Sequence, residues 1–310
     1  MNYYKDLKEQ LYLSESEYIS FIRTIPFRYK RYYIPKRNSA EKRLIAQPAR
    51  TVKTIQKYII EHLSTKLSVH QCATAYQVGT GIKLNASKHK DNSYILKMDF
   101  SKFFESITPE ILKARLKEAK INLTKDELFL FENLFFWRKT RKGTLRLSVG
   151  APSSPFISNT IMYSFDKQIE DKCQELGVVY TRYADDMAFS TNKKDVLKQI
   201  EKLVYKNLKD CFGRAIKVNR KKTVYTSKKF NRHITGITIT NDNKLSLGRD
   251  KKRLLHSKVH HFITGTLSNE ETLKLRGELG FAIHIEPLFI KKLELKYSCE
   301  VIEKLKKFKL

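Results

Sequence analysis

The feature that most constrains this chain is the stretch of residues 178–190, VVYTRYADDMAFS. Two runs rich in Val, Tyr, Thr and Phe flank a short polar centre, a pattern that predicts a β-hairpin. Its tip carries Asp185 and Asp186. Adjacent carboxylates repel each other, so they destabilise a fold unless they are fully solvated or a cation lies between them. An Asp-Asp pair alone favours the solvated turn, so a cation site needs support from a second observation.

A third carboxylate favours the cation site. Asp99 lies near the end of another strand-like run, SYILKMDF, at residues 93–100. Carboxylates on adjacent strand ends could hold two Mg²⁺ ions roughly 3.5–4 Å apart, the arrangement that polymerases use for in-line phosphoryl transfer. The sequence therefore predicts two Mg²⁺ ions per active site, with Asp99 and Asp185 as ligands of both ions and Asp186 as the weaker third ligand.

The net charge of +29 over 310 residues indicates a polyanionic partner. Each Lys or Arg that neutralises a phosphate releases a condensed counterion, so such an excess favours nucleic-acid binding. Residues 191–310 hold 29 Lys and Arg against 12 Asp and Glu, which makes the C-terminal part the candidate for gripping a duplex. With 41% apolar residues and no low-complexity tract, the chain is globular and long enough for two or three subdomains.

Cysteine spacing and the N-terminus indicate the compartment. The four cysteines, Cys72, Cys173, Cys211 and Cys299, are scattered without a C-x-x-C pair, which favours reduced thiols over a zinc site. The N-terminus lacks the apolar segment of a signal peptide, and no apolar run approaches the roughly 18 residues that span a bilayer. The sequence therefore predicts a cytoplasmic protein without a membrane partner.

The order of the expected elements indicates an α+β fold. The N-terminal part is expected to hold a helix that begins near Ser14, a basic aromatic hairpin at 27–48 with its turn at 36–39, and a helix at 51–67. From Tyr94 the expected order is a strand, two helices that begin near Thr108 and Thr124, one long helix at 156–176, and the Asp-Asp hairpin. After the hairpin we expect a helix at 195–212 and a strand at 215–219. The chain is then expected to form a hairpin of 233–240 with 244–247, followed by basic helices at 249–310. This order predicts an antiparallel sheet with helices on one face.

Several stretches allow two interpretations. The basic hairpin at 27–48 could lay cationic side chains on a nucleoside triphosphate, or it could be an ordinary solvated hairpin. The small residues of the loop at 148–155 let a nucleic-acid strand approach the backbone closely, although a plain entry to the following helix explains its prolines. His89 could contact RNA, but a lone His is more often a hydrogen-bonded structural residue. Glycines within 75–89 lack P-loop spacing and give no support for a Walker-type NTPase.

Five stretches together resemble the reverse transcriptases, with the right order and spacing over about residues 25–300. They are RLIAQP (43–48), similar to the first fingers motif; MDFSKFF (98–104), similar to the first metal-binding motif; GAPSSP (150–155), similar to the loop beneath the template; YADD (183–186), which matches the catalytic hairpin; and NRKKT (219–223), which matches the Asn-x-x-Lys-Thr element with one further Lys in the run. Val149 departs from the family, which usually has Gln there, so an amide near the incoming nucleotide is missing.

Two further features are similar to the retron branch of that family. NASKH at 85–89 matches the Asn-Ala-x-x-His box, and ITG at 234–236 is similar to the Val-Thr-Gly triplet. The resemblance implies an enzyme whose thumb binds a structured noncoding RNA (msr-msd) and that copies part of it from a priming guanosine 2′-hydroxyl. The product is single-stranded DNA joined to RNA by a branch (msDNA). Such systems generally act in antiphage defence, which implies an effector protein as partner and leaves open an oligomer formed through msDNA or the effector.

The resemblance also implies roles for single residues. Phe104, five residues after Asp99, takes the place of the steric gate, where a bulky ring would collide with a ribose 2′-hydroxyl and so select dNTPs; core packing is the alternative. The backbone carbonyl of Phe100 completes one metal coordination sphere. The candidate nucleotide-binding residues are Lys42, Arg43, Phe104, Gly150 and Lys222, with Lys221 as the alternative near the pyrophosphate. The candidate RNA-binding residues are Asn85, His89, Thr235, Gly236, Arg249, Lys251, Lys252 and Arg253.

The fold implied by this resemblance is a right-hand polymerase. It assigns residues 1–92 to an N-terminal helix and fingers, 93–240 to a palm with interspersed fingers helices, and 241–310 to a basic helical thumb that binds RNA. The alternatives are a group II intron-like or diversity-generating reverse transcriptase, an RNA-dependent RNA polymerase, and a structural RNA-binding protein on a polymerase fold. An intron enzyme is expected to carry maturase regions after the thumb, an RNA polymerase a smaller or polar residue at position 104, and a binding protein to lack a carboxylate. An RNase H domain is not expected here.

Overall fold

A five-stranded antiparallel sheet forms the centre of the computed structural model, which describes residues 2–35 and 40–309. Its middle strand pairs with one strand on one side and with two short strands on the other. The order is β6 (Val179–Tyr183), β7 (Asp186–Thr191), β3 (Tyr94–Ser101) and β8 (Lys217–Val218), with β9 (Val224–Ser227) also on β3. This sheet confirms the predicted strand at 93–100 and the Asp-Asp hairpin.

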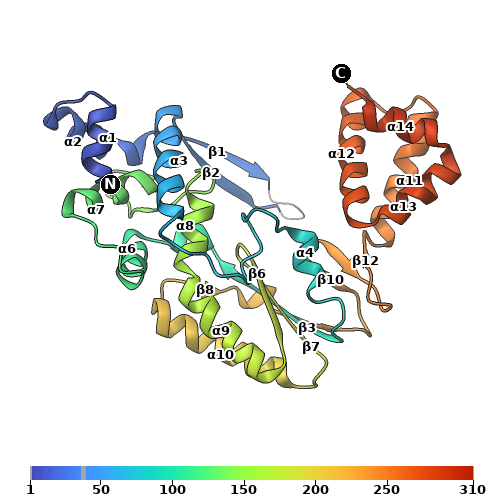
Figure 1. Cartoon of the computed structure of the whole chain (residues 1–310). Coiled ribbons are helices and arrows are strands. Elements are labelled where there is room, and N and C mark those ends of the chain that lie inside the picture. The colour runs from blue at the N-terminus through green and yellow to red at the C-terminus, as the bar shows by residue number, and fades with distance from the viewer. Residues whose placement is uncertain (1, 36–39, 310) are drawn as a thin grey trace.

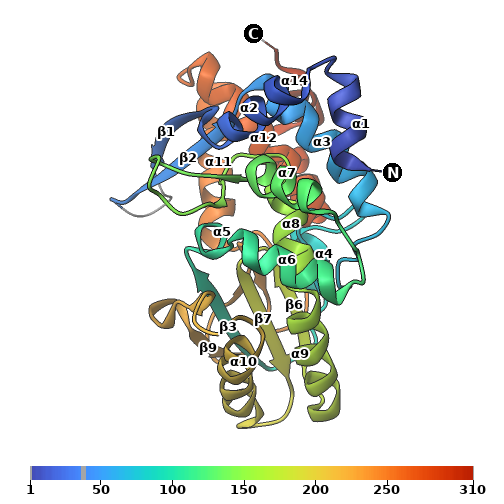
Figure 2. The ribbon, with the colours of Figure 1, turned by 90° about the vertical axis from the view of Figure 1, so that its left-hand side faces the viewer.

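Helices cover one face of this sheet, as the sequence predicted. Leu96, Met98 and Phe100 of β3 alternate with Ile95, Lys97 and Asp99, because successive side chains of a strand point to opposite faces. The first set belongs to the main hydrophobic core. Figure 2 shows α9 (Tyr163–Leu176) and α10 (Val196–Phe212) lying across that face. Asp99 therefore lies on the face that these two helices leave uncovered.

The predicted long helix at 156–176 is two helices. The first is α8 (Ser154–Ile161), and α9 follows after Met162. The end of α9 agrees with the prediction, because Gly177 takes a left-handed φ of 70° that ends a helix readily. Gly213, with φ 60°, follows α10 in the same way.

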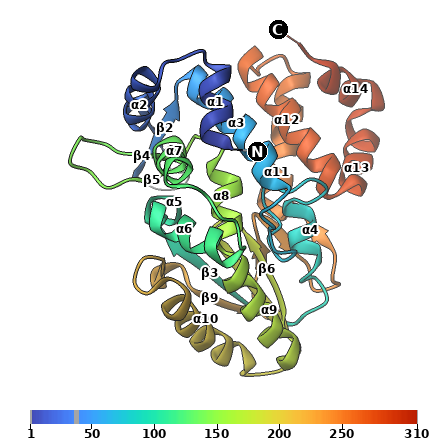
Figure 3. The ribbon, with the colours of Figure 1, turned by 60° about the vertical axis from the view of Figure 1, so that its left-hand side comes forward.

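An N-terminal helical body packs on the same main core (Figure 3). Its helices are α1 (Tyr3–Gln10), α2 (Glu15–Thr24), α3 (Arg50–Ser64) and α7 (Lys125–Phe135), with the short turn η1 (Ile25–Phe27). Ser14 and Thr124 form capping boxes at α2 and α7, which confirms those two predicted starts. The hairpin β1 (Tyr29–Pro35) and β2 (Lys42–Pro48) projects from this body. The turn predicted at 36–39 lies outside the described residues.

A second hydrophobic core holds the C-terminal part together. It contains the short helix α4 (Ile82–Ser87), the sheet of β10 (Arg232–Ile234), β11 (Ile237–Ile239) and β12 (Leu245–Ser246), and the helices α11 (Arg249–Ile263), α12 (Asn269–Ile285), α13 (Pro287–Tyr297) and α14 (Cys299–Lys307). Ile95 and Ala188 of the central sheet also belong to it. Figure 1 shows α11 to α14 set apart from the N-terminal body, with the β1–β2 hairpin projecting toward them.

The predicted strand at 233–240 is interrupted. Ile234 pairs with Ile237, so Thr235 and Gly236 form a two-residue turn between β10 and β11. Both take positive φ, 46° and 79°, which is the backbone of a tight hairpin turn and suits Gly at the second position. The predicted pairing with residues 244–247 is confirmed as β11 with β12.

Short elements complete the structure. They are α5 (Phe103–Ser106), α6 (Pro109–Glu118), the pair β4 (Phe136–Trp137) and β5 (Arg146–Leu147), and the turn η2 (Arg220–Lys222). Within residues 2–35 and 40–309, no helix combines the length and the apolar composition that crossing a lipid bilayer requires.

Candidate active site

The turn between β6 and β7 presents two carboxylates at the end of the central sheet. Tyr183 pairs with Asp186, so Ala184 and Asp185 form a two-residue loop. Ala184 takes a left-handed φ of 55°, which costs a residue with a Cβ about 1–2 kcal/mol. The N–H of Phe100 donates to the carbonyl of Asp185 at 3.1 Å. The turn is therefore strained and is tied to the end of β3.

The third predicted carboxylate meets this turn across the sheet. Asp99 of β3 is the register partner of Asp186 of β7. Asp99 is buried, Asp185 is half-buried, and Asp186 keeps part of its surface exposed although its carboxyl group is crowded by the protein. The structure thus brings together the three acidic side chains predicted from the sequence, although Asp99 and Asp185 are 86 residues apart in the chain.

Negative charge crowds at this point. The pKa of Asp185 is raised, first by burial and then by the charge of Asp99. The pKa of Asp186 is raised to about 7 by burial, by the charges of Asp185 and Asp99, and by a hydrogen bond with Asp99. Like charges disfavour ionisation of one another, so these carboxylates are poised to bind a cation.

A lysine supplies part of the missing positive charge. Nζ of Lys222 lies 2.9 Å from Oδ2 of Asp99. Burial lowers the pKa of Lys222, but its hydrogen bond to Asp99 and the nearby carboxylates outweigh that effect and raise it overall. Of the two lysines that the sequence left open, Lys222 is therefore the one bonded to a catalytic candidate, while Lys221 lines the adjacent cleft.

The donor set suits a hard divalent cation. Carboxylate and carbonyl oxygens are the ligands that Mg²⁺ prefers, and the raised pKa values of Asp185 and Asp186 report unbalanced negative charge. Across residues 2–35 and 40–309, however, no three acidic, His or Cys side chains converge tightly enough to form a ready-made metal site. The ligands are therefore brought to neighbouring strand ends but are not closed into a cage.

A cleft of about 500 Å³ opens beside these carboxylates on the face of the sheet that carries Lys97 and Asp99. His233 and Gly236 also line it. Burial lowers the pKa of Lys97, and Asp186 partly offsets this effect. The cleft is large enough for a nucleotide unit of a strand whose end reaches Asp99.

The fingers candidates lie on β2. Lys42 and Arg43 are both exposed and pair with Pro35 and Ile34, at the end of the hairpin where β1 ends and β2 begins. The charge of Arg43 is felt by Tyr76, whose pKa is raised by burial and then by Asp185 and Tyr183, while Arg43 lowers it in part. Arg43 and the catalytic turn therefore influence one and the same side chain, as expected for a cation near the triphosphate.

Phe104 lies on α5, directly after β3. Its ring is half-buried and packs edge-on against the buried Phe103, with ring centroids 5.6 Å apart. The packing fixes the orientation of the ring and leaves part of it accessible. Both interpretations of Phe104 from the sequence, a gate or core packing, are compatible with a ring held in this way.

Gly150 lies against a fingers strand. Its φ is 122°, and a Cβ there would lie 3.0 Å from Cγ2 of Ile45 and 3.3 Å from the carbonyl oxygen of Ala46. The carbonyl of Val149 accepts from the N–H of Ala46 at 3.0 Å, and the hydroxyl of Ser148 donates to the carbonyl of Ala46. Glycine is thus needed where this loop joins β2, a reason that the sequence did not reveal.

Two of the predicted RNA contacts have buried side chains. His89 is fully buried, and its ring nitrogens lie 2.7 Å from the hydroxyls of Ser190 and Thr181. Burial and the charge of Lys88 lower the pKa of His89 to about 3, so the ring is neutral. Asn85 is also buried and bridges to Thr74 and Thr235. His89 is not open to RNA here, and we correct its expected direct contact to a role in joining the end of α4 to the central sheet. Asn85 also lines the cleft beside the carboxylates, so its contact with RNA stays a prediction.

The remaining RNA-binding candidates divide into two groups. Thr235 and Gly236 form the β10–β11 turn, where the carbonyl of Gly236 accepts from Nζ of Lys251 at 3.0 Å. Lys252 forms an ion pair with Glu286 at 2.5 Å inside the C-terminal bundle, so part of its charge is already neutralised. Arg249 and Arg253 are exposed on α11.

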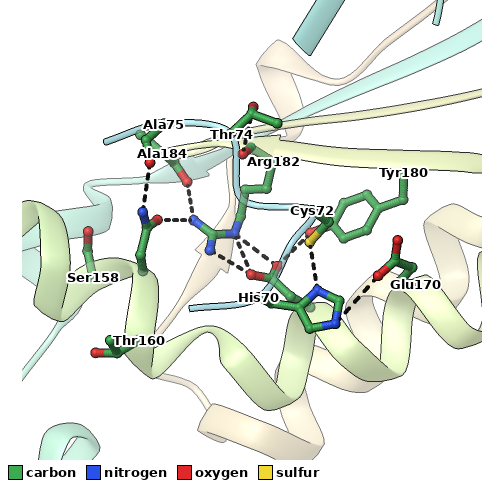
Figure 4. A network of polar contacts seen from close by, with 12 residues as sticks. His70, Cys72, Thr74, Ala75, Ser158, Thr160, Glu170, Tyr180, Arg182 and Ala184 are labelled. Carbon is green, nitrogen blue, oxygen red and sulfur yellow. Dashed lines mark hydrogen bonds and ion pairs between the residues drawn. The ribbon is translucent and has the colours of Figure 1, made fainter. Parts of the chain in front are cut away.

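Sequence reasoning missed a buried polar network behind the catalytic turn (Figure 4). Arg182 is fully buried and forms a 2.6 Å ion pair with Asp166 of α9. It also contacts Asn159 and the carbonyl of Ala184. The one signal in the sequence was an Arg inside an otherwise apolar and aromatic strand, which requires a buried partner.

Comparisons with known proteins agree with this geometry. Residues 34–239 match the family model described as reverse transcriptase (RNA-dependent DNA polymerase). The chain is 48% identical to the retron Ec83 reverse transcriptase of Escherichia coli, over 90% of each chain, and 30% identical to the retron Ec73 reverse transcriptase of the same organism, over 84% of each. An apo telomerase from Candida tropicalis is similar in fold, with a TM-score of 0.51 and 12% identity. That match covers 88% of this chain and 58% of the telomerase chain.

Proposed function

Because the chain belongs to the retron reverse transcriptases, we propose that this RNA-directed DNA polymerase copies part of a cognate structured noncoding RNA into msDNA. The observation that carries the site assignment is the pairing of Asp99 with Asp186 across β3 and β7, beside the strained turn that holds Asp185. An open cleft next to these residues has room for the strand that carries the attacking hydroxyl.

In the proposed reaction, the hydroxyl loses its proton to water, its oxygen bonds to the α-phosphorus of a dNTP, and the bond from this phosphorus to the pyrophosphate oxygen breaks. Asp99, Asp185 and Asp186, with the carbonyl of Phe100, would hold two Mg²⁺ ions. When bound, the ions neutralise charge that develops on the phosphoryl oxygens. Lys222 keeps its proton because its pKa lies above the ordinary value, so it can donate to the leaving pyrophosphate.

The other side of the nucleotide would be held by the fingers and by α5. Lys42 and Arg43 offer charge-assisted hydrogen bonds to the triphosphate from β2. The ring of Phe104 stands at the ribose and excludes a 2′-hydroxyl from the incoming nucleotide. Gly150 contributes by letting the loop of residues 148–150 pack tightly on β2, which keeps that strand in place.

The priming strand is proposed to be RNA that enters through the 500 Å³ cleft. Its guanosine 2′-hydroxyl would reach Asp99, and Lys97 would lie close to a neighbouring phosphate because it faces into the cleft. Extension from a 2′-hydroxyl leaves the RNA chain continuous through its 3′ linkage. The DNA product is therefore joined to the RNA by a branch.

The proposed division of the chain is residues 1–92 as N-terminal helix and fingers, 93–240 as palm and 241–310 as thumb. The C-terminal helices of the thumb are proposed to recognise the cognate RNA. The exposed Arg249 and Arg253 on α11, and Lys251 beside the β10–β11 turn, support this assignment by their charge. An effector protein, a role in antiphage defence, and assembly through msDNA or the effector are further parts of the proposal that follow from membership of the family.

Extraction of copurifying nucleic acid tests the proposed function. The gene is expressed with its upstream genomic flank, as wild type, Asp185→Asn and the control Asp195→Asn. Asp195 is an exposed surface residue that pairs with Lys198 at 3.4 Å, so its substitution makes the same chemical change away from the site. We expect wild type and control to yield a short DNA whose link to RNA is cut by a debranching enzyme, and Asp185→Asn to yield none. Unbranched DNA would contradict the retron product, and RNA alone in all samples would contradict synthesis itself.

A further inference from the structure

The guanidinium group of Arg182 lies directly behind the catalytic turn and has no exposed surface. Its Nε and Nη2 donate to Asp166 at 2.9 and 2.6 Å. Its Nη1 donates to the carbonyl of Ala184 at 2.9 Å and to Oδ1 of Asn159 at 3.1 Å (Figure 4). One side chain therefore connects helices α8 and α9 to the two-residue loop that carries Asp185.

Stability alone does not explain this arrangement. A buried ion pair loses the hydration of both ions, and apolar side chains of similar volume often stabilise a fold equally well. What a guanidinium adds is a planar fork whose donors point in fixed directions. Asp166 holds one edge of the fork, and Tyr180 donates to Asp166 at 2.8 Å from the other side. The direction of Nη1 is thereby fixed.

The bond from Nη1 to Ala184 fixes the orientation of the next residue. A peptide unit is planar, so a bond that holds the carbonyl of Ala184 also fixes the orientation of the backbone N–H of Asp185. Ala184 is in the left-handed region, which is disfavoured for a residue with a Cβ. The bond opposes relaxation of Ala184 to an ordinary φ.

The same network also reaches the segment that contains Thr74 and Ala75. Nδ2 of Asn159 donates to the carbonyl of Ala75 at 2.8 Å, and the N–H of Thr74 donates to the carbonyl of Arg182 at 2.8 Å. Tyr76, the next residue, is the side chain whose pKa responds to both Asp185 and Arg43. The segment that holds Thr74 and Ala75 is thus attached to the same buried group as the turn that carries Asp185.

We propose that Arg182 is a positioning residue for the polymerase reaction: through Nη1 it holds the left-handed turn at Ala184, and so aims Asp185 and Asp186 at the cations they bind. The inference rests on the proposed function, in which these two carboxylates are cation ligands. Arg182 itself touches neither cation nor nucleotide.

Arg182→Lys tests this role, because an ammonium keeps the charge that Asp166 needs but lacks a fork that reaches Asp166 and Ala184 together. The matched control is Tyr180→Phe, which removes one hydrogen bond to the same Asp166 without touching the turn.

The dissociation constant of Mn²⁺ is measured by electron paramagnetic resonance of the free ion, and primer extension is measured as a function of Mg²⁺. A misplacement of ligands by about 1 Å weakens a site roughly 10- to 100-fold, so we expect that rise for Arg182→Lys and less than about twofold for Tyr180→Phe.

Rescue separates positioning from a general loss of structure. Glycine tolerates left-handed φ, so adding Ala184→Gly to Arg182→Lys is expected to recover part of the Mn²⁺ affinity. If Arg182→Lys is not obtained folded, Asn159→Ala replaces it, since Asn159 accepts from the same Nη1 and its loss should raise the Mn²⁺ dissociation constant above that of Tyr180→Phe.

Two results would overturn the inference: equal Mn²⁺ affinity in the Arg182 or Asn159 variant and in Tyr180→Phe, or no recovery with Ala184→Gly. Asp185→Asn, measured alongside, keeps the two proposals apart. If Asp185→Asn binds Mn²⁺ like wild type, the ligand assignment itself is wrong. If it loses Mn²⁺ while Arg182→Lys behaves like Tyr180→Phe, only the positioning role is wrong.

Discussion

Phe104 is the side chain proposed to select the sugar of the incoming nucleotide. The ring is half-buried and packs edge-on against Phe103, which limits its movement. A ring that excludes a ribose 2′-hydroxyl acts through its bulk rather than through a hydrogen bond. Removing the bulk should therefore relax the choice between dNTP and NTP without abolishing synthesis.

We predict that Phe104→Ala raises the use of NTP relative to dNTP by roughly 10- to 200-fold, the range by which pocket shape alone discriminates. The ratio of kcat/KM for the two nucleotides measures the change. Phe129→Ala is the control, because Phe129 is also half-buried on the main core but lies on α7. An unchanged ratio in Phe104→Ala would assign Phe104 to core packing.

Asp186 gives the site a pH dependence. Its pKa is raised to about 7 by burial and by Asp185 and Asp99, so the cation-free protein gains a proton there as pH falls below 7. Cation binding has to displace that proton. We predict that Mn²⁺ affinity falls up to about tenfold between pH 7 and 6, and that Asp186→Asn flattens the dependence. Titrations at pH 6, 7 and 8 test it, and an equal affinity at all three would contradict it.

The sign for stability is the opposite of that for a salt-bridged carboxylate. A raised pKa means that the folded state disfavours the charged form of Asp186, so the cation-free protein loses stability as pH rises from about 4 toward 7. Asp186→Asn should accordingly have the higher Tm at pH 8 in the absence of divalent ions, and the difference should shrink at pH 5.

Single residues were the most predictable part of the site. The meeting of Asp99, Asp185 and Asp186 at one end of the sheet could be predicted because acidic residues at the ends of strands have few structural reasons to be there, and their role as cation ligands stays a prediction. The RNA contact expected of His89 was wrong because a sequence does not show burial: the hydroxyls of Thr181 and Ser190, which bond to its ring nitrogens, come from two other strands.

Among the elements, the junction of β2 with the loop of residues 148–150 connects the part proposed as fingers to the part proposed as palm. Val149 and Ser148 bond to the backbone of Ala46, and Gly150 fits where a Cβ would press on Ile45 and Ala46. The loop therefore sets the position of the strand that carries Lys42 and Arg43.

Gly150→Ala should disturb this junction in two ways. The left-handed φ of 122° and the contact of 3.0 Å with Ile45 together predict a loss of at least about 1–2 kcal/mol in the free energy of unfolding, and the shift of β2 predicts a higher KM for dNTP. Gly280→Ala on α12 is the control, because it has open space around it and should stabilise the helix by up to about 1 kcal/mol. Chemical denaturation and dNTP titration measure both. A neutral Gly150→Ala would show that the junction tolerates a Cβ.

Element boundaries were predicted where local chemistry decides them. Ser14, Thr124, Gly177 and Gly213 marked helix ends correctly because caps act within one turn. The break at Met162 and the turn at Thr235 were missed, since the first depends on packing and the second interrupts a run of β-branched residues with only one Gly.

At the scale of the whole molecule, the central sheet contributes side chains to two hydrophobic cores. The sequence predicted the α+β class and the basic C-terminal region from patterning and charge. It could not predict that Ile95 and Ala188 of the palm join the core of the C-terminal helices, because that packing links segments far apart in the chain.

The exposed cations of α11 should contribute to RNA binding through phosphates. We predict that Arg249→Gln with Arg253→Gln lowers the slope of log affinity against log salt by about one for each phosphate that the protein no longer neutralises. The control removes equal charge elsewhere: Lys274→Gln with Lys307→Gln, whose lysines pair with Glu270 and Glu303. Filter binding of the cognate RNA across a series of salt concentrations measures the slopes. Equal slopes for both double variants would place the RNA on another surface.

The most direct test of the account is cation-dependent synthesis by the purified protein. Wild type, Asp185→Asn with Asp186→Asn, and the control Asp195→Asn are given a primed RNA template, dNTPs and Mg²⁺, and Mn²⁺ binding is measured on the same preparations. The account predicts DNA synthesis and Mn²⁺ binding for wild type and control, and loss of both when the two carboxylates at the catalytic turn are neutralised. Synthesis that persists in the double variant would contradict the assignment of Asp185 and Asp186.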